Sequence, residues 1–346
     1  MTETYKTEIS SITTGPRQSN IELLRIFAML LVLIVHATFF TTGAPNINDF
    51  ATSPVSSFTK AFFQSISIVC VNVFILISGW FGIRPSVKGF CNFLFQCFFL
   101  LISLYAVSML MGWSTLSFNG VKECLCMTTR SWFICAYAGL YILSPTLNAF
   151  AEKSTKQQFK VMLVSFFILQ TFWGGSGSSG RFFLSGYSTI SFIGLYLLAR
   201  YIRIYTSDGI RINKYGIWIY IISVIGCTVG YYVCITNGIP KDIYAYSSPL
   251  VITGALGLLL FFNGLHIKPN RYINFVAKSS FAVYLLHLNS NTLPFFQNCI
   301  LRIYTSTSGI KCLALIFIFL ITVYIACIIF DQPRKWLWNL ISKKIA

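Results

Sequence analysis

Three ionisable residues in one apolar stretch of the sequence could do chemistry together: Glu22, Arg25 and His36. Histidine is a natural general base for a hydroxyl near neutral pH. Arginine suits phosphates or a developing negative charge. Ionisable groups inside a membrane-spanning helix are costly, which makes them candidates for function. The stretch therefore offers a base, a cation and a neighbouring carboxylate to a catalytic site.

The spacing of Arg25 and His36 places both on one side of a single helix. They lie in the run 20–40, which is long enough to cross a bilayer as a helix. Eleven residues at 100° each bring the two side chains within roughly 20° of each other, about 16 Å apart along the axis. One helix face thus presents a cation near a membrane surface and an imidazole well inside.

Further candidates lie in other apolar segments, each with an alternative interpretation. His287 lies within an apolar helix and could line a cavity together with His36 or make only a helix–helix hydrogen bond. The pair Ser78–Gly79 is typical of close helix packing or of a backbone approach to a ligand. Arg84 and Lys88 follow at the inner surface, as topology determinants that contact lipid headgroups or as an anion-binding entrance.

Arg130 and Trp132 open a predicted span at its outer end. A tryptophan there is ordinarily an interface anchor, whereas Arg130 beside it could address a polar or acidic acceptor. We find no Ser-His-Asp spacing, no HExxH, no acidic cluster and no CxxC, so no metal is predicted. This inventory favours direct transfer between two bound substrates over a covalent intermediate.

The composition identifies the protein that must position these residues as an all-α integral membrane protein. Its 346 residues are 55% apolar and only 10% charged, with a mean hydropathy of +0.71, whereas soluble domains are near 25% charged. The apolar runs predict about ten transmembrane helices around a central cavity: 21–42, 58–82, 90–112, 131–150, 158–174, 187–203, 214–236, 247–266, 274–298 and 312–331.

The positive charges predict how these helices are oriented. Alternate segments starting from the N-terminus hold 18 Lys and Arg and the opposite segments hold 7, so both termini are expected in the cytoplasm. This distribution explains the net charge of +17 without nucleic acid as a partner. We expect one domain over 1–346, with a polar cytoplasmic tail at 1–19 and an interfacial helix at 332–346 that lies on membrane lipids.

Several motifs resemble the acyltransferase 3 family of membrane acyltransferases. Arg25 and His36 within NIELLRIFAMLLVLIVH are similar to the family's opening motif, with Glu22 where many members have Asp. Similar pieces follow in the family's order at 73–81 (VFILISGWF), 132–148 (WFICAYAGLYILSPTLN) and 281–287 (FAVYLLH). The resemblance therefore covers most of the chain.

This resemblance implies an enzyme of the inner or plasma membrane that transfers an acyl group, usually acetyl. The donor would be cytoplasmic acetyl-CoA or another acyl-CoA, and the acceptor a hydroxyl of a surface glycan or a lipid-linked glycan precursor. His36 would be the general base and Arg25 would act on the donor side. A transporter or flippase for a glycan or lipid is the alternative, because ten spans and intramembrane histidines also suit proton-coupled transport. A structural or sensory membrane protein is a third possibility.

Overall fold

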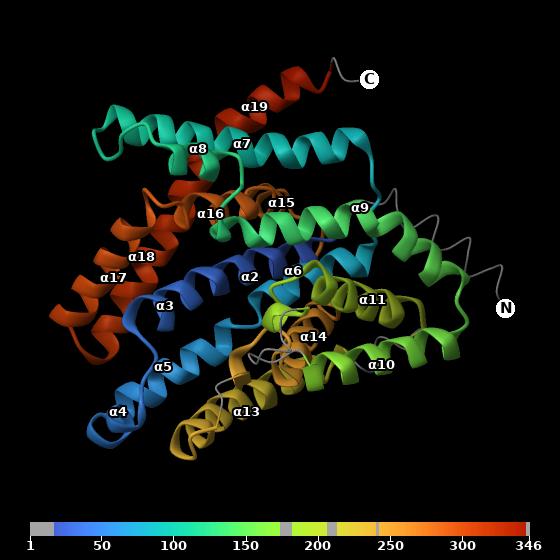
Figure 1. Cartoon of the computed structure of the whole chain (residues 1–346), viewed down its shortest axis with the longest axis horizontal. Coiled ribbons are helices and arrows are strands. Elements are labelled where there is room, and N and C mark those ends of the chain that lie inside the picture. Colours follow the sequence, from blue (N-terminus) through green and yellow to red (C-terminus); the bar gives the residue numbers. More distant parts are fainter. Residues whose placement is uncertain (1–16, 174–181, 206–212, 240–241, 344–346) are drawn as a thin grey trace.

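A computed structural model describes residues 17–173, 182–205, 213–239 and 242–343, so most of the predicted tail 1–19 lies outside it. All regular elements of the described residues are helices (Figure 1). They are α2 (Ser19–Ala37), α3 (Phe39–Thr42), α4 (Ile47–Thr52), α5 (Pro54–Ser67), α6 (Cys70–Phe81), α7 (Val87–Leu110), α8 (Phe118–Cys124), η1 (Thr129–Ser131), α9 (Trp132–Lys153), α10 (Lys156–Trp173), η3 (Leu184–Gly186), α11 (Thr189–Tyr205), α13 (Gly216–Thr236), η4 (Asp242–Tyr244), α14 (Pro249–Asn263), α15 (Arg271–Ala277), α16 (Ser280–His287), α17 (Leu293–Ser306), α18 (Gly309–Phe330) and α19 (Gln332–Ile341).

Six helical segments of the described chain are long and apolar enough to cross a membrane. They are Ser19–Thr42, Pro54–Phe81, Val87–Leu110, Phe118–Lys153, Gly216–Thr236 and Gly309–Ile341. The other four predicted spans are also helical, but α10, α11, α14 and the segments of 274–298 are shorter or less apolar than these six. The all-helical prediction is therefore confirmed, and six of the ten predicted spans have the expected length and hydropathy.

The prediction of one continuous helix over 274–298 is wrong. The chain forms α15, α16 and α17 there, with breaks at 278–279 and 288–292. The second break holds the polar run from Asn289 to Thr292, where the Asn289 side chain accepts a hydrogen bond of 3.0 Å from the Asn291 backbone N–H. Such side-chain bonds compete with the helical ladder. The sequence predicted one helix here because the residues on both sides of this turn are mostly apolar.

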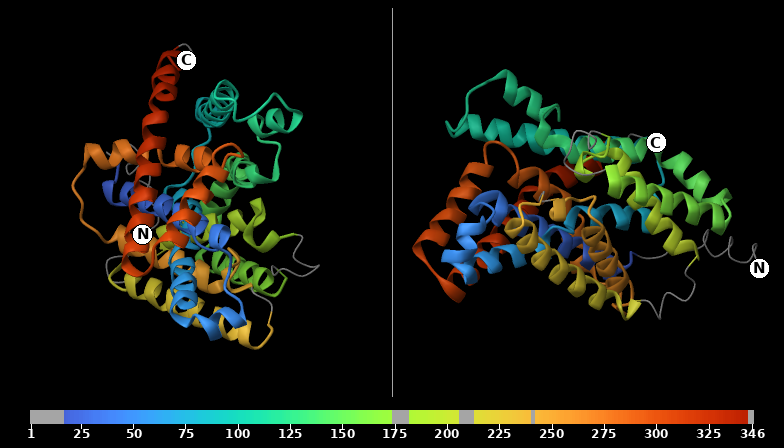
Figure 2. Two further views of the ribbon diagram at one scale, coloured as in Figure 1. Left: turned by 90° about the vertical axis from the view of Figure 1, so that its left-hand side faces the viewer. Right: turned by 60° about the horizontal axis from the view of Figure 1, so that its bottom comes forward.

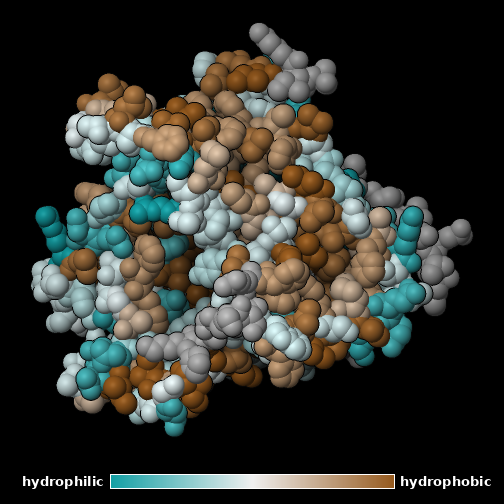
Figure 3. Space-filling model, viewed as in Figure 1, coloured by the Kyte–Doolittle hydropathy of each residue, from teal (hydrophilic) through white to brown (hydrophobic). Residues whose placement is uncertain are grey.

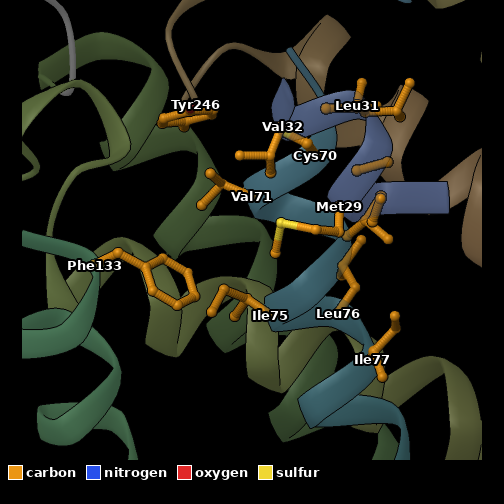
Figure 4. Packing of buried hydrophobic residues seen from close by; sticks show 14 of the residues in the cluster. Met29, Leu31, Val32, Cys70, Val71, Ile75, Leu76, Ile77, Phe133 and Tyr246 are labelled. Carbon is orange, nitrogen blue, oxygen red and sulfur yellow. The ribbon is translucent and has the colours of Figure 1, made fainter. Parts of the chain in front are cut away.

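Helix α6 lies at the centre of the bundle and packs against α2, α11 and α14. Gly79 makes the α6–α11 approach possible, because a Cβ added there would lie 2.3 Å from the Tyr196 carbonyl oxygen. Helix α16 packs against α2, α7 and α18, and α19 crosses over α7 (Figures 1 and 2). In Figure 4, Met29 and Val32 of α2 face α6, and Phe133 and Tyr246 approach from other elements.

The surface matches a protein that crosses a bilayer. Most long helices run roughly parallel in Figure 1, and hydrophilic residues gather toward the left and right edges of Figure 3, near the helix ends. Hydrophobic residues cover much of the surface between these edges. Large apolar side chains such as Ile222, Ile318 and Ile329 are about two-thirds exposed, as lipid-facing residues would be.

Candidate functional site

A cavity of about 630 Å³ runs along α2 between α6, α7, α9 and α16. One end, which we call the basic end, is lined by five cations: Arg17, Arg25, Lys278, Arg334 and Lys335. The opposite end, which we call the aromatic end, is lined by four rings: Phe40, Trp132, Tyr187 and Tyr246. Because α2 contributes residues to both ends, the cavity follows most of the length of that helix.

Arg25 is held in place at the basic end by Glu22. Its Nη1 donates hydrogen bonds of 3.0 and 2.8 Å to the two carboxylate oxygens, and Arg17 lies 3.6 Å from the same group. Glu22 is buried, so this pairing holds the guanidinium in a defined position. No described residue takes a hydrogen bond from Nε or Nη2 of Arg25, which leaves N–H groups for a ligand in the cavity.

His36 and His287 meet inside the bundle. His36 Nδ1 lies 3.1 Å from His287 Nε2, although 251 residues separate them in sequence. His36 lines the cavity directly, whereas His287 is 3% exposed and lies behind it. Phe40 packs edge-on against the His36 ring, with 5.3 Å between the ring centroids, and the Phe296 and His287 ring centroids are 5.8 Å apart. The predicted cavity residue His287 therefore contacts the candidate base itself.

The hydrogen-bond partners of this pair assign the protons on both rings. His287 Nδ1 lies 2.5 Å from the Val283 carbonyl oxygen, which can only accept, so Nδ1 carries the proton. In a neutral ring, His287 Nε2 is then an acceptor, and His36 Nδ1 must donate to it. The remaining nitrogen of His36, Nε2, keeps its lone pair. This is the arrangement that a general base requires.

Three rings of the aromatic end form a compact group. The ring centroid of Trp132 lies 4.5 Å from that of Tyr187, and Trp132 stacks with Tyr246 at a centroid distance of 6.0 Å. Asn72 of α6 fixes the loop that carries Tyr246 by donating a hydrogen bond of 2.9 Å to its carbonyl oxygen. Burial raises the pKa of the Tyr246 phenol well above its usual value, so this hydroxyl stays protonated and can donate a hydrogen bond.

The other predicted site residues divide between the cavity and the surface. Ser78 lines the cavity, and its hydroxyl lies 3.4 Å from that of Tyr137. Arg84, Lys88 and Arg130 are exposed and do not line the cavity. Lys88 donates to the Ser342 carbonyl oxygen at 2.8 Å, which ties α7 to the end of α19. The cations that line the cavity therefore come from segments other than 84–88.

Sequence reasoning missed several charged and amide residues that line this cavity. Lys278 lies in the break between α15 and α16, and Arg334 and Lys335 lie in α19. In the sequence, these three charges were interpreted only as signals of membrane topology. Asn92 and Gln96 lie in the apolar helix α7. Their spacing of four residues, two amides on one face of an apolar helix, is a signal that the sequence does contain.

Comparison with known proteins identifies the family. The model of an acyltransferase domain, Acyl_transf_3, matches residues 18–331, nearly the whole chain. The chain belongs to this acyltransferase 3 family. It is therefore a multi-pass membrane acyltransferase, and the resemblance seen in its motifs is confirmed. No curated protein and no solved structure matches the chain. Among the described residues, no three His, Cys, Asp or Glu side chains come together as a set that could hold a metal ion.

Proposed function

We propose that this acyltransferase moves an acetyl group from acetyl-CoA to a hydroxyl of a surface glycan or of its lipid-linked precursor, in the inner or plasma membrane. The observation that carries the proposal is the cavity itself, which joins five cations at one end to the lone pair of His36. Family membership favours acyl transfer over the alternative of transport.

The basic end suits the phosphates of coenzyme A. Among the described residues, two carboxylates, Glu22 and Asp331, pair with four of its five cations, so the end carries an excess of positive charge. The axial distance of about 16 Å from Arg25 to His36 matches the pantetheine arm. That arm is comparable to four or five extended peptide residues, about 15 Å at 3.3–3.6 Å each. A donor held by its phosphates at Arg25 would bring its thioester to His36.

His36 supplies the proton chemistry in this scheme. Its Nε2 removes the proton of the acceptor hydroxyl, and the oxygen attacks the thioester carbonyl carbon to form a tetrahedral intermediate. Collapse of the intermediate breaks the carbon–sulfur bond, and the imidazolium returns the proton to the leaving thiolate. The products are the acetyl ester and free CoA. His287 stabilises the transient charge on His36 by accepting its Nδ1 proton in a hydrogen bond.

The aromatic end suits the acceptor. Sugar rings carry apolar C–H faces and polar edges, and Trp132 and Tyr187 offer flat apolar surfaces beside the Tyr246 hydroxyl. Because Phe40 of this end packs on His36, a sugar bound there would lie next to the base. We therefore place the acceptor at the aromatic end and the donor at the basic end.

Transfer of labelled acetyl from acetyl-CoA to glycan in membranes tests this function. We expect His36→Ala to lower the rate by about 10²- to 10⁴-fold, because it removes the base, and Arg25→Ala to raise KM for acetyl-CoA. His266→Ala is the matched control, since His266 is exposed and does not line the cavity. Undiminished transfer by both cavity variants would refute the assigned roles.

A further inference from the structure

Two carboxamide side chains on α7 line the cavity without a partner. Gln96 is about nine-tenths buried, and Asn92 is partly buried. Neither Asn92 Oδ1 nor Gln96 Nε2, both enclosed atoms, has a hydrogen-bond partner in the described part of the chain. Nor do their other amide atoms bond to any described residue. Because buried polar groups in proteins are nearly always hydrogen-bonded, these two amides call for a partner from outside the protein.

The two amides face the cavity as a regular pair. Residues four apart on a helix lie on one face, one turn and about 6 Å apart along the axis. Each amide offers both a donor N–H₂ and an acceptor oxygen. The pair is therefore suited to a molecule that itself carries two amides in a row.

The neighbours of α7 place this face of the helix beside the basic end of the cavity. The first turn of α7 contacts α19 through the bond from Lys88 to Ser342, and Phe95 packs on Trp338 of that helix at 5.3 Å. Phe93, between the two amides in sequence, packs on Tyr137, which lines the cavity together with Arg25. A chain running from the basic end to His36 would pass along this face of α7.

We propose that Asn92 and Gln96 bind the two amide groups of the pantetheine arm of an acyl-CoA donor. This inference rests on the proposed function for the identity of the donor. The arm carries two amides joined by two methylene carbons. The two amides lie about 5 Å apart, because the arm has one more methylene between its amides than a peptide has, and successive α-carbons of a peptide are 3.8 Å apart. That spacing matches one turn of α7, and amide–amide hydrogen bonds satisfy both orphaned side chains.

Equilibrium binding to the purified full-length protein in lipid nanodiscs tests the proposal with two ligands. CoA carries the phosphates of its nucleotide and also the pantetheine arm. In contrast, 3′,5′-ADP carries a 3′-phosphate and a 5′-phosphate but no arm. We expect Asn92→Leu and Gln96→Met to weaken CoA binding by about tenfold each and to leave 3′,5′-ADP binding unchanged. Retained 3′,5′-ADP binding also shows that each variant is folded.

Gln170→Met is the matched control, because Gln170 of α10 also has a buried amide oxygen without a partner but does not line this cavity. Unchanged CoA affinity when Asn92→Leu and Gln96→Met are combined would mean that water alone satisfies the amides, and it would overturn the proposal. So would equal weakening of CoA and 3′,5′-ADP, an equal loss in the control, or failure of the wild-type protein to bind CoA.

Acetyl transfer measured on the same preparations separates this proposal from the proposed function. If the wild-type protein binds CoA through these amides but transfers no acetyl group, the proposed function fails and the amide contacts stand. If transfer proceeds and the amide variants bind CoA like the wild type, the amide contacts fail and the proposed function stands.

Discussion

At the scale of single residues, the site depends on two pairs in which one member positions the other. The bidentate contact of Glu22 with Nη1 of Arg25 leaves the remaining N–H groups for a ligand. The Val283 carbonyl orients His287, which in turn orients His36. Both supporting residues are buried, so in the proposed mechanism each would act through its partner rather than on substrate.

Replacement of His287 tests this positioning. We expect His287→Ala to lower kcat for acetyl transfer by about tenfold to 100-fold while KM for acetyl-CoA changes little, because the base loses its orienting acceptor but the donor contacts remain. His287→Gln offers an amide oxygen as acceptor and should recover part of the loss. A purely structural role would instead change kcat, KM and expression together, and His287→Gln would give no recovery.

At the scale of elements, α19 extends the site beyond the matched family domain, which ends at residue 331. Buried Asp331 anchors the helix through bonds of 2.6 and 3.1 Å from Arg334 Nε and Nη2. Lys335 lies 3.6 Å from the same carboxylate and 2.5 Å from the Ser279 hydroxyl, at the break between α15 and α16. The chain end thereby brings two cations to the basic end.

Neutralising one of these cations should weaken donor binding. We expect Lys335→Gln to raise KM for acetyl-CoA by about 3- to 10-fold, an effect that shrinks at high salt, because a charge-assisted contact to phosphate is lost. KM for S-acetyl-pantetheine, which lacks the nucleotide phosphates, should stay unchanged. Lys343→Gln, outside the cavity at the same end of the chain, is the control; an equal effect there would refute a specific contact.

The packing of α6 against α11 also belongs to the scale of elements, because α6 lines the cavity. Gly79→Ala should destabilise the protein by about 1–3 kcal/mol, because the added Cβ would overlap the Tyr196 carbonyl oxygen and push the helices apart. Thermal unfolding in detergent measures the change. Gly226→Ala on α13 is the control, since its Cβ would meet Leu250 only at ordinary contact distance, 3.4 Å. Equal melting of both variants and the wild type would contradict this packing argument.

At the scale of the whole molecule, charge and hydropathy place the helix ends relative to the membrane. Arg25, Lys278 and the cations of α19 gather at one end of the cavity. The segments on this side of the membrane hold 18 Lys and Arg, whereas the segments on the opposite side hold 7, which predicts that this end faces the cytoplasm. A cytoplasmic basic end is where a soluble acyl-CoA would enter, and the aromatic end would then face the opposite side.

Reporter fusions test this orientation. We expect a fluorescent protein to be bright and alkaline phosphatase to be inactive at both termini, because the ten predicted crossings, an even number, would return the chain to the cytoplasm. A phosphatase fused after residue 115, between α7 and α8, should be active as the matched outward control. Active phosphatase at either terminus would contradict the positive-charge argument and would reverse the proposed entry sides of donor and acceptor.

The sequence by itself determined the class of this protein and the first half of its site. Long apolar runs must be helical in a bilayer, because each backbone polar group needs an internal partner. Arg25 and His36 share a cavity wall because one helix carries both at a fixed period. These conclusions depend only on local geometry, and a single segment is enough to reach them.

Only the tertiary structure decided which distant residues complete the site. The meeting of His287 with His36, the choice of Lys278 and Lys335 over Arg84 and Lys88, and the break before α17 all depend on how helices pack. Between apolar helices, packing depends on small residues and local shape rather than on a hydrophobic period. The sequence therefore predicts what each helix carries, whereas packing decides which helices face one another.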